Sequence, residues 1–287
     1  MIKSLASFYY SDKDIKYLLM DNMKIAVIQL KSGSDKTDNI NRVLALCETA
    51  INKQAKLLAF PEMFNYRNDP FDHNQCEDVP GFSLSPFLEL AKNNAVWILA
   101  GSIAERVPNS NKCYNTSVLI NNNGQIIAKY RKIHLFDVEI EDKVILESDY
   151  LIPGDTPVIA DIEGVCTGLS ICYDLRFPEL YRYYSDNNAK ILFIPSAFTK
   201  PTGEAHWEVL LRARAIENQC YVIAPNQAGL GPKEVLTYGN SLIIDPWGNI
   251  LARGSDTEEE VLIADLDMQK LANIRKNIPC LKHRKTH

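Results

Sequence analysis

Cys172 occupies the position in this sequence that best suits a nucleophile. It follows residues 168–171 (GLSI), which have the composition of a buried strand, and it precedes residues 173–179, where the strand pattern breaks and a helix can begin. A thiol at such a junction lies at the edge of a sheet, near helix N–H groups that stabilise a thiolate. A lone cysteine more often packs as a small buried hydrophobe, so its position alone leaves both roles open.

Glu62 is the first candidate for the base that such a thiol needs. It follows the apolar residues 57–60 and Pro61, at the carboxyl end of an expected strand, where the ligands of α/β sheets gather. An acid after a strand is often an exposed turn residue, but the apolar neighbours Phe60, Met63 and Phe64 fit that role poorly. Histidine is the usual partner of a cysteine nucleophile, and a dyad with His134 or His206 stays open.

Lys132 lies in a segment where residues alternate between two environments. Strand alternation over residues 128–136 predicts that Tyr130, Lys132 and His134 share one face, while Lys129 and Arg131 share the other. A lysine that faces a core must be paired with carboxylates or must act on a negative intermediate. The alternative is an ordinary surface lysine.

The elements that would hold these residues follow a doubled order. Each half of the chain is expected to contain strand, helix, strand, helix, strand and hairpin, with apolar spacings of three and four residues in the helices. The expected strands of the first half are 24–30, 57–60, 96–102, 114–120 and 126–130, and its helices lie at 40–51 and within 83–93. In the second half the expected strands are 165–171, 191–194, 221–224, 241–244 and 250–252, and the helices are 178–185 and 208–218.

The absence of a Gly/Ser linker between the halves indicates one domain built from two related β-α halves. We expect this domain to span residues 23–287, after a poorly ordered N-terminal extension of residues 1–22. A sheet from each half with helices outside gives a layered α/β sandwich.

Composition excludes several classes of protein. The chain has 287 residues, 46% hydrophobic, with a formal net charge of −5. The acidic balance argues against nucleic-acid binding, and no apolar run approaches the ~20 residues of a membrane helix. The seven cysteines form no CxxC pair, which predicts neither a disulfide framework nor a zinc site. We therefore expect a soluble, cytoplasmic protein with reduced thiols.

Three segments together resemble the motifs of the nitrilase, or carbon-nitrogen hydrolase, superfamily. They are residues 60–62 (FPE), 130–136 (YRKIHLF) and 172–180 (CYDLRFPEL), in the order of that family, and the similarity extends from about residue 24 to residue 284. The resemblance implies a four-layer αββα sandwich and a catalytic triad of Glu62, Lys132 and Cys172. It also implies that Glu147 positions the lysine and assists proton transfer, that no metal or organic cofactor is needed, and that the chain forms a homodimer or higher homo-oligomer.

The chemistry expected from this resemblance is hydrolysis of a small linear amide through a thioester. Glu62 would take the thiol proton, Lys132 and the Tyr173 backbone N–H would stabilise the oxyanion, and water would cleave the acyl-enzyme. Arg176 lies about one helical turn after the nucleophile, where its guanidinium could bind a substrate carboxylate. It could instead form an ion pair with Glu179 or Asp174.

The expected substrate follows from a finer resemblance. Residues 195–198 and 202–222 resemble the branch that contains deaminated-glutathione amidase and ω-amidase, and residues 278–284 favour the former. Asn240, where that branch usually has histidine, and the loop 229–237 depart from the pattern. Deaminated glutathione is the first expected substrate and α-ketoglutaramate the second. An N-carbamoyl amine hydrolase and a non-catalytic binding module of the same fold are the alternatives.

Overall fold

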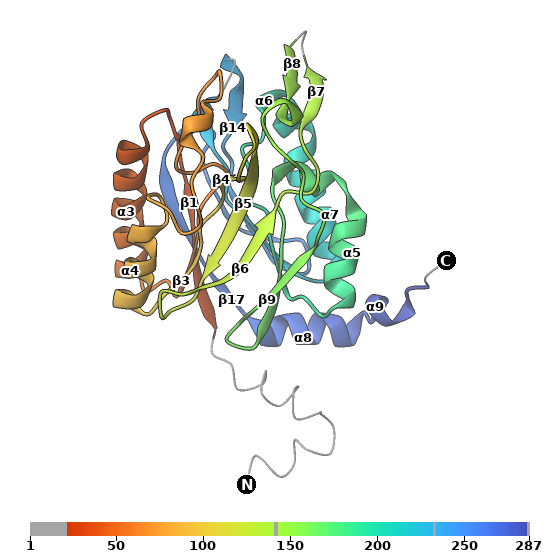
Figure 1. Cartoon of the computed structure of the whole chain (residues 1–287). Coiled ribbons are helices and arrows are strands. Elements are labelled where there is room, and N and C mark those ends of the chain that lie inside the picture. Colours follow the sequence, from red (N-terminus) through yellow and green to blue (C-terminus); the bar gives the residue numbers. More distant parts are fainter. Residues whose placement is uncertain (1–21, 141–142, 232–233, 286–287) are drawn as a thin grey trace.

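Two sheets lie face to face between outer helices in the computed structural model, which describes residues 22–140, 143–231 and 234–285 (Figure 1). The space between the sheets holds one apolar cluster that includes Ile25 and Val27 of the first sheet and Ile191 and Phe193 of the second. Ala26 and Ile28 alternate with Ile25 and Val27 and belong to a separate cluster on the outer face of the first sheet. The first sheet is therefore buried on both sides, and the architecture is the expected αββα sandwich.

The first sheet has seven strands in the order β17-β1-β2-β3-β5-β4, with β6 paired to β5. Helices α3 (Lys36–Asn52) and α4 (Ser85–Asn94) cover its outer face (Figure 1). Asp35 caps α3 by accepting a hydrogen bond from the Asp38 N–H at 3.0 Å. The strands of this sheet are β1 (Met23–Gln29), β2 (Leu57–Ala59), β3 (Trp97–Leu99), β4 (Ile103–Arg106), β5 (Cys113–Ile120), β6 (Ile126–Arg131) and β17 (Glu260–Leu266).

The second sheet has six strands in the order β16-β15-β12-β11-β10-β9. Helices α5 (Pro178–Asp186) and α7 (Glu208–Asn218) lie on its outer side (Figure 1). Gly168 of β10 allows α5 to approach closely, because a Cβ there would stand 2.5 Å from Cγ of Tyr184. The strands are β9 (Val158–Ile162), β10 (Val165–Leu169), β11 (Ile191–Phe193), β12 (Tyr221–Ala224), β15 (Leu242–Ile244) and β16 (Ile250–Arg253).

Smaller elements complete the described chain. Two hairpins stand apart from the main sheets, β7 (Asp137–Ile140) with β8 (Lys143–Leu146) and β13 (Ala228–Leu230) with β14 (Leu236–Tyr238). The remaining helices are α6 (Lys200–Thr202), α8 (Met268–Asn277), α9 (Cys280–His283), η1 (His73–Gln75), η2 (Glu147–Asp149), η3 (Cys172–Arg176) and η4 (Gly203–Trp207). None of the helices within the described ranges is long and apolar enough to cross a bilayer.

The doubled order of elements is confirmed, except that one strand of the second half joins the sheet of the first half. The helix expected at 208–218 has those bounds in the structure, and the strand expected at 221–224 is β12. Strand β17, however, comes from the end of the second half and pairs with β1 over seven residues of the first sheet. The expected N-terminal extension, residues 1–22, lies outside the described residues apart from Asn22.

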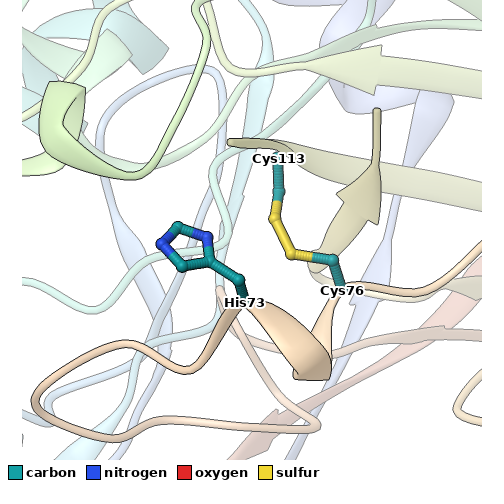
Figure 2. A group of neighbouring side chains, drawn as sticks. All are labelled: His73, Cys76 and Cys113. Atoms are coloured by element: carbon teal, nitrogen blue, oxygen red, sulfur yellow. A yellow bond between two sulfur atoms is a disulfide. The ribbon is translucent and has the colours of Figure 1, made fainter. Parts of the chain in front are cut away.

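The expectation that the chain carries no disulfide is wrong for two of its cysteines. Cys76 and Cys113 form a disulfide with a Cα–Cα distance of 6.4 Å, and His73 lies beside the two sulfur atoms (Figure 2). The pair is 37 residues apart in sequence, and it is brought together by a ladder in which residue 77 pairs with β4 and β4 pairs with β5. Because the two cysteines meet only through strand pairing, their spacing in the sequence does not predict the disulfide. The cysteine pattern therefore no longer supports a reducing compartment.

Candidate active site

Cys172 begins the short helix η3 directly after the second sheet's strand β10 and residues 170–171. Its φ of +47° is a left-handed conformation that non-glycine residues adopt at a cost. The Cys172 N–H donates to the carbonyl oxygen of Pro195 at 2.9 Å, which holds the turn against the neighbouring strand end. Burial, and after it the negative charge of Glu62, raise the pKa of the thiol well above its ordinary value. The resting sulfur is therefore a neutral thiol that needs a base.

Asp174 holds the nucleophile turn in place. Its carboxylate is fully buried and accepts hydrogen bonds from the Ile171 N–H at 2.8 Å and from the Tyr130 hydroxyl at 2.6 Å. It also accepts one from the His134 N–H at 3.0 Å and lies 2.7 Å from His134 Nδ1. One carboxylate thus joins the turn that carries Cys172 to the segment that carries Lys132.

Glu62 lies at the end of β2 and is only 3% exposed. Its Oε1 accepts hydrogen bonds from Lys132 Nζ at 2.9 Å and from Asn115 Nδ2 at 2.8 Å. Its Oε2 accepts a hydrogen bond from the backbone N–H of Ala197 at 2.8 Å. These three donors come from different parts of both sheets, so they fix the direction in which the carboxylate points.

Lys132 faces the interior, as strand alternation predicts. Tyr130 and Lys132 are 0% and 1% exposed, whereas the side chains of Lys129 and Arg131 are about 40% exposed and pair with Glu105. Burial alone would lower the pKa of Lys132, but Glu147 and Glu62 hold it well above its ordinary value. The ammonium is therefore a fixed positive charge in a desolvated site.

Glu147 completes the group as the expected second glutamate. It accepts hydrogen bonds from Lys132 Nζ at 2.9 Å and 2.8 Å, one to each carboxylate oxygen. Its Oε2 also accepts from the Phe136 N–H at 2.8 Å. Burial raises the pKa of Glu147, although Lys132 opposes this shift. Lys132 is consequently held between two carboxylates from distant parts of the chain.

A cavity opens onto this group. Its lining includes Glu62, Lys132, Glu147, Cys172 and Tyr173, together with Phe71, Phe136, Tyr150 and Phe198 from surrounding loops. Tyr173 follows Cys172 directly, and within the described ranges its N–H makes no hydrogen bond to a backbone carbonyl.

The two histidines that stayed open as partners of Cys172, His134 and His206, do not line this cavity among the described residues. His134 stacks on Phe177 with ring centroids 3.6 Å apart and bonds to Asp174, and His206 lies 3.3 Å from Arg176 Nη1. Neither histidine is among the described residues that line the cavity. The structure thus favours Glu62 as the base over either Cys–His dyad.

Arg176 and Asn240 also lie outside the described cavity lining. The Arg176 guanidinium lies over the rings of Tyr173 and Phe198, at 5.6 Å and 5.2 Å from their centroids. Asn240 has a φ of +49° and bonds to the carbonyl of Tyr238, a conformation that asparagine tolerates well. Asn240 therefore has a local structural role in its turn.

Sequence reasoning missed the groups that support the four central side chains. Asn115 and the Ala197 N–H, which bond to Glu62, lie in a strand and a loop with no signal of their own. Asp174 was considered only as an ion-pair partner of Arg176, yet the apolar residues around it in the sequence could have marked it as a buried acid that needs several donors.

Comparison with known proteins supplies independent information. The profile of the carbon-nitrogen hydrolase family matches residues 24–276. The chain is 39% identical over 269 residues to omega-amidase NIT2 of Mus musculus and 40% identical over 280 residues to deaminated glutathione amidase of Dictyostelium discoideum. Each alignment covers 93% of this chain and 96% of the relative. Nit3 of Saccharomyces cerevisiae, a member of the nitrilase superfamily, superposes with a TM-score of 0.82 at 34% identity, covering 94% of this chain and 98% of that one.

Proposed function

Since the chain belongs to the carbon-nitrogen hydrolase family, we propose that it is a cysteine-dependent amidase in which Cys172 forms a thioester with a small linear amide. The observation that carries this proposal is the Lys132 ammonium, which bonds to Glu62 and Glu147 in the cavity that Cys172 lines. A buried charge of this kind is costly unless the site uses it.

The first half-reaction releases ammonia. Glu62 takes the proton of the Cys172 thiol as the sulfur attacks the amide carbon, and the carbonyl oxygen gains the electron pair. Lys132 and the Tyr173 N–H stabilise this oxyanion, because both donors are fixed before the charge develops. When the carbon–nitrogen bond breaks, protonated Glu62 gives its proton to the leaving nitrogen, and a thioester remains.

The second half-reaction releases the acid. Glu62 takes a proton from a water molecule, whose oxygen attacks the thioester carbon, and the same two donors stabilise the second oxyanion. The carbon–sulfur bond then breaks, and the proton on Glu62 returns to the sulfur. Glu147 holds the Lys132 ammonium in position, and through this lysine it assists proton transfer at Glu62.

The proposed substrate is deaminated glutathione, with α-ketoglutaramate as the second candidate. Relatives named for each activity are almost equally similar to this chain, so the two compounds must be compared directly. The deciding measurement is ammonia release from both, expressed as the ratio of the two kcat/KM values.

Cys172→Ala tests the mechanism. We expect it to abolish ammonia release from an α-keto-acid amide while the fold is retained, and we expect Glu62→Gln to be nearly as severe because the base acts in both half-reactions. Cys166→Ala is the matched control, since Cys166 lies on the preceding strand and its thiol donates to the carbonyl of Asn187. Turnover retained by Cys172→Ala would refute the proposal.

The alternatives predict other outcomes of the same assays. An N-carbamoyl amine hydrolase would release CO2 together with ammonia. A non-catalytic binding module would show no thioester adduct by intact mass spectrometry under excess amide. Either result would replace the amidase proposal.

We further propose a homodimer formed through the outer face of α5 and α7. Large apolar side chains are exposed there, including Tyr183 at 45%, Val209 at 67% and Ile216 at 49%, with Trp247 at 54% on the adjoining turn. Light scattering should give twice the chain mass for the wild-type protein and the chain mass for Val209→Glu. A monomeric wild-type protein would contradict this arrangement.

A further inference from the structure

Arg67 is a second cationic side chain at the active-site cavity, and the mechanism above does not use it. It lies on the loop that follows Glu62 and is among the residues that line the cavity. Its backbone N–H bonds to the Gly33 carbonyl at 2.9 Å, which fixes the start of the side chain. The backbone of Arg67 is therefore held in place where its side chain lines the cavity.

The Arg67 guanidinium lacks a partner in the described part of the chain. Its Nη1 atom is buried without any hydrogen bond, and no carboxylate of a described residue forms an ion pair with it. The two acids of the site are already engaged, since Lys132 bonds to both Glu62 and Glu147. A buried Nη1 donor without an acceptor is costly, and a ligand can remove that cost.

The surrounding charges keep Arg67 cationic. Burial lowers its pKa to about 10, and the nearby charge of Glu62 opposes that shift. The side chain therefore carries a full positive charge at neutral pH. Its planar fork matches a carboxylate in geometry as well as in charge.

Gly231, which follows β13, leaves room for this guanidinium. A Cβ on Gly231 would stand 2.4 Å from Arg67 Nη2, so any larger residue at that position would displace the guanidinium. Arg67 thus occupies space that the glycine leaves open, between the loop after Glu62 and the hairpin of β13 and β14.

We propose that Arg67 binds the carboxylate of an anionic amide substrate, at the end remote from the bond that Cys172 attacks. This inference rests on the proposed amidase function, and it assigns the residue that recognises the free carboxylate of the two proposed substrates. Arg67 is then a specificity residue, and Arg176, whose guanidinium lies on the rings of Tyr173 and Phe198, is not the main carboxylate partner.

The rival role for Arg67 is to balance the charges of Glu62 and a Cys172 thiolate. That role would affect every amide equally, because it acts on the reacting groups rather than on the remote end of the substrate. A pair of substrates that differ only at that end separates the two roles.

The test compares succinamate with butyramide, in which a methyl group replaces the carboxylate. We expect Arg67→Gln to lower the ratio of the two kcat/KM values at least about tenfold, with Arg67→Lys intermediate because lysine keeps the charge but loses the fork. Arg212→Gln, on the outer helix α7, is the control and should keep the wild-type ratio. Thermal melting of each variant verifies the fold.

Two results would overturn the proposal. The first is an equal loss for both amides in Arg67→Gln, which would assign Arg67 to the reacting groups. The second is a kcat/KM ratio of succinamate to butyramide that falls in Arg176→Gln and stays unchanged in Arg67→Gln. This result would assign binding of the substrate carboxylate to Arg176.

A binding measurement separates this inference from the amidase proposal. If the wild-type protein hydrolyses neither amide, the amidase proposal fails, and protection of Cys172 from iodoacetamide by glutarate is then measured by mass spectrometry. Protection that weakens at least about tenfold in Arg67→Gln would still support an anion site at Arg67. Equal protection in both proteins would refute it.

Discussion

Asp174→Asn is the substitution that most directly tests how the active site is held together. The Asp174 carboxylate is 0% exposed and takes donors from both the nucleophile turn and the Lys132 segment. Asparagine has nearly the same shape, so the change removes the charge and one acceptor without opening a cavity.

The size of the effect follows from those donors. The amide NH2 group cannot accept a hydrogen bond. If it replaces Oδ2, both the Ile171 N–H and the Tyr130 hydroxyl lose their acceptor, and if it replaces Oδ1, the His134 N–H loses its acceptor. A buried unsatisfied donor costs about 1–3 kcal/mol, and hydrogen bonds to a charged acceptor are worth about 1.5–3 kcal/mol each. We therefore expect unfolding to become about 3–5 kcal/mol easier, which is a fall in Tm of roughly 6–10 °C at about 2 °C per kcal/mol for a chain of this size.

Calorimetry and steady-state kinetics together check this prediction. Besides the lower Tm, kcat/KM should fall at least about tenfold at temperatures where the variant is folded, because Ile171 directly precedes Cys172 and small displacements of a nucleophile are costly. Asp161→Asn is the control, since Asp161 is exposed and its carboxylate accepts a hydrogen bond from the Gly164 N–H. An unchanged Tm would refute the assignment of the buried carboxylate, and a lower Tm with full activity would refute its role in positioning the nucleophile.

Three further predictions concern other parts of the molecule. Cys76→Ser should reduce stability by about 2–4 kcal/mol, since the disulfide to Cys113 closes a loop of 37 residues; a Tm equal to that of the non-reduced wild-type protein would contradict it. Alkylation of substrate-free Cys172 should accelerate continuously between about pH 7 and 9, because a raised thiol pKa keeps the thiolate a minor species throughout that range, and a plateau below pH 9 would show that the pKa is not raised. Gly168→Ala should destabilise the fold by about 1–3 kcal/mol through the contact of the new Cβ with Tyr184, and a variant as stable as the wild-type protein in urea would count against the close approach of α5.

Local patterns predicted most of the sandwich because they depend on neighbours in the sequence. The apolar spacing of α3 and the bounds of α7 follow from helical periodicity alone, and the turn run after β5 marks its hairpin with β6. Strand β17 was not predicted, because nothing in its sequence specifies a partner at the other end of the chain. The hairpins β7–β8 and β13–β14 are short and half-exposed, so their alternation is too weak to detect.

The residues of the candidate site also fall into those that the sequence predicted and those that it did not. Glu62, Lys132, Glu147 and Cys172 could be named from residue type, position and motif, and the structure brings them to one cavity. Their supporting hydrogen bonds could not be named, because Asn115 and Ala197 reach Glu62 only through the packing of two sheets. Arg67 was missed for a similar reason, since an arginine in a polar loop looks solvated until the fold encloses it.

The pairing of β1 with β17 has a consequence for how the protein is made. Residues 23–29 leave the ribosome long before residues 260–266, so the first sheet is synthesised with one edge unpaired. Most of β1 is apolar and fully buried in the finished molecule, and an exposed edge of that composition invites pairing with other chains. The nascent N-terminal half therefore exposes this edge until the last strand arrives, and a fragment that ends before residue 260 is expected to aggregate more readily than the full chain.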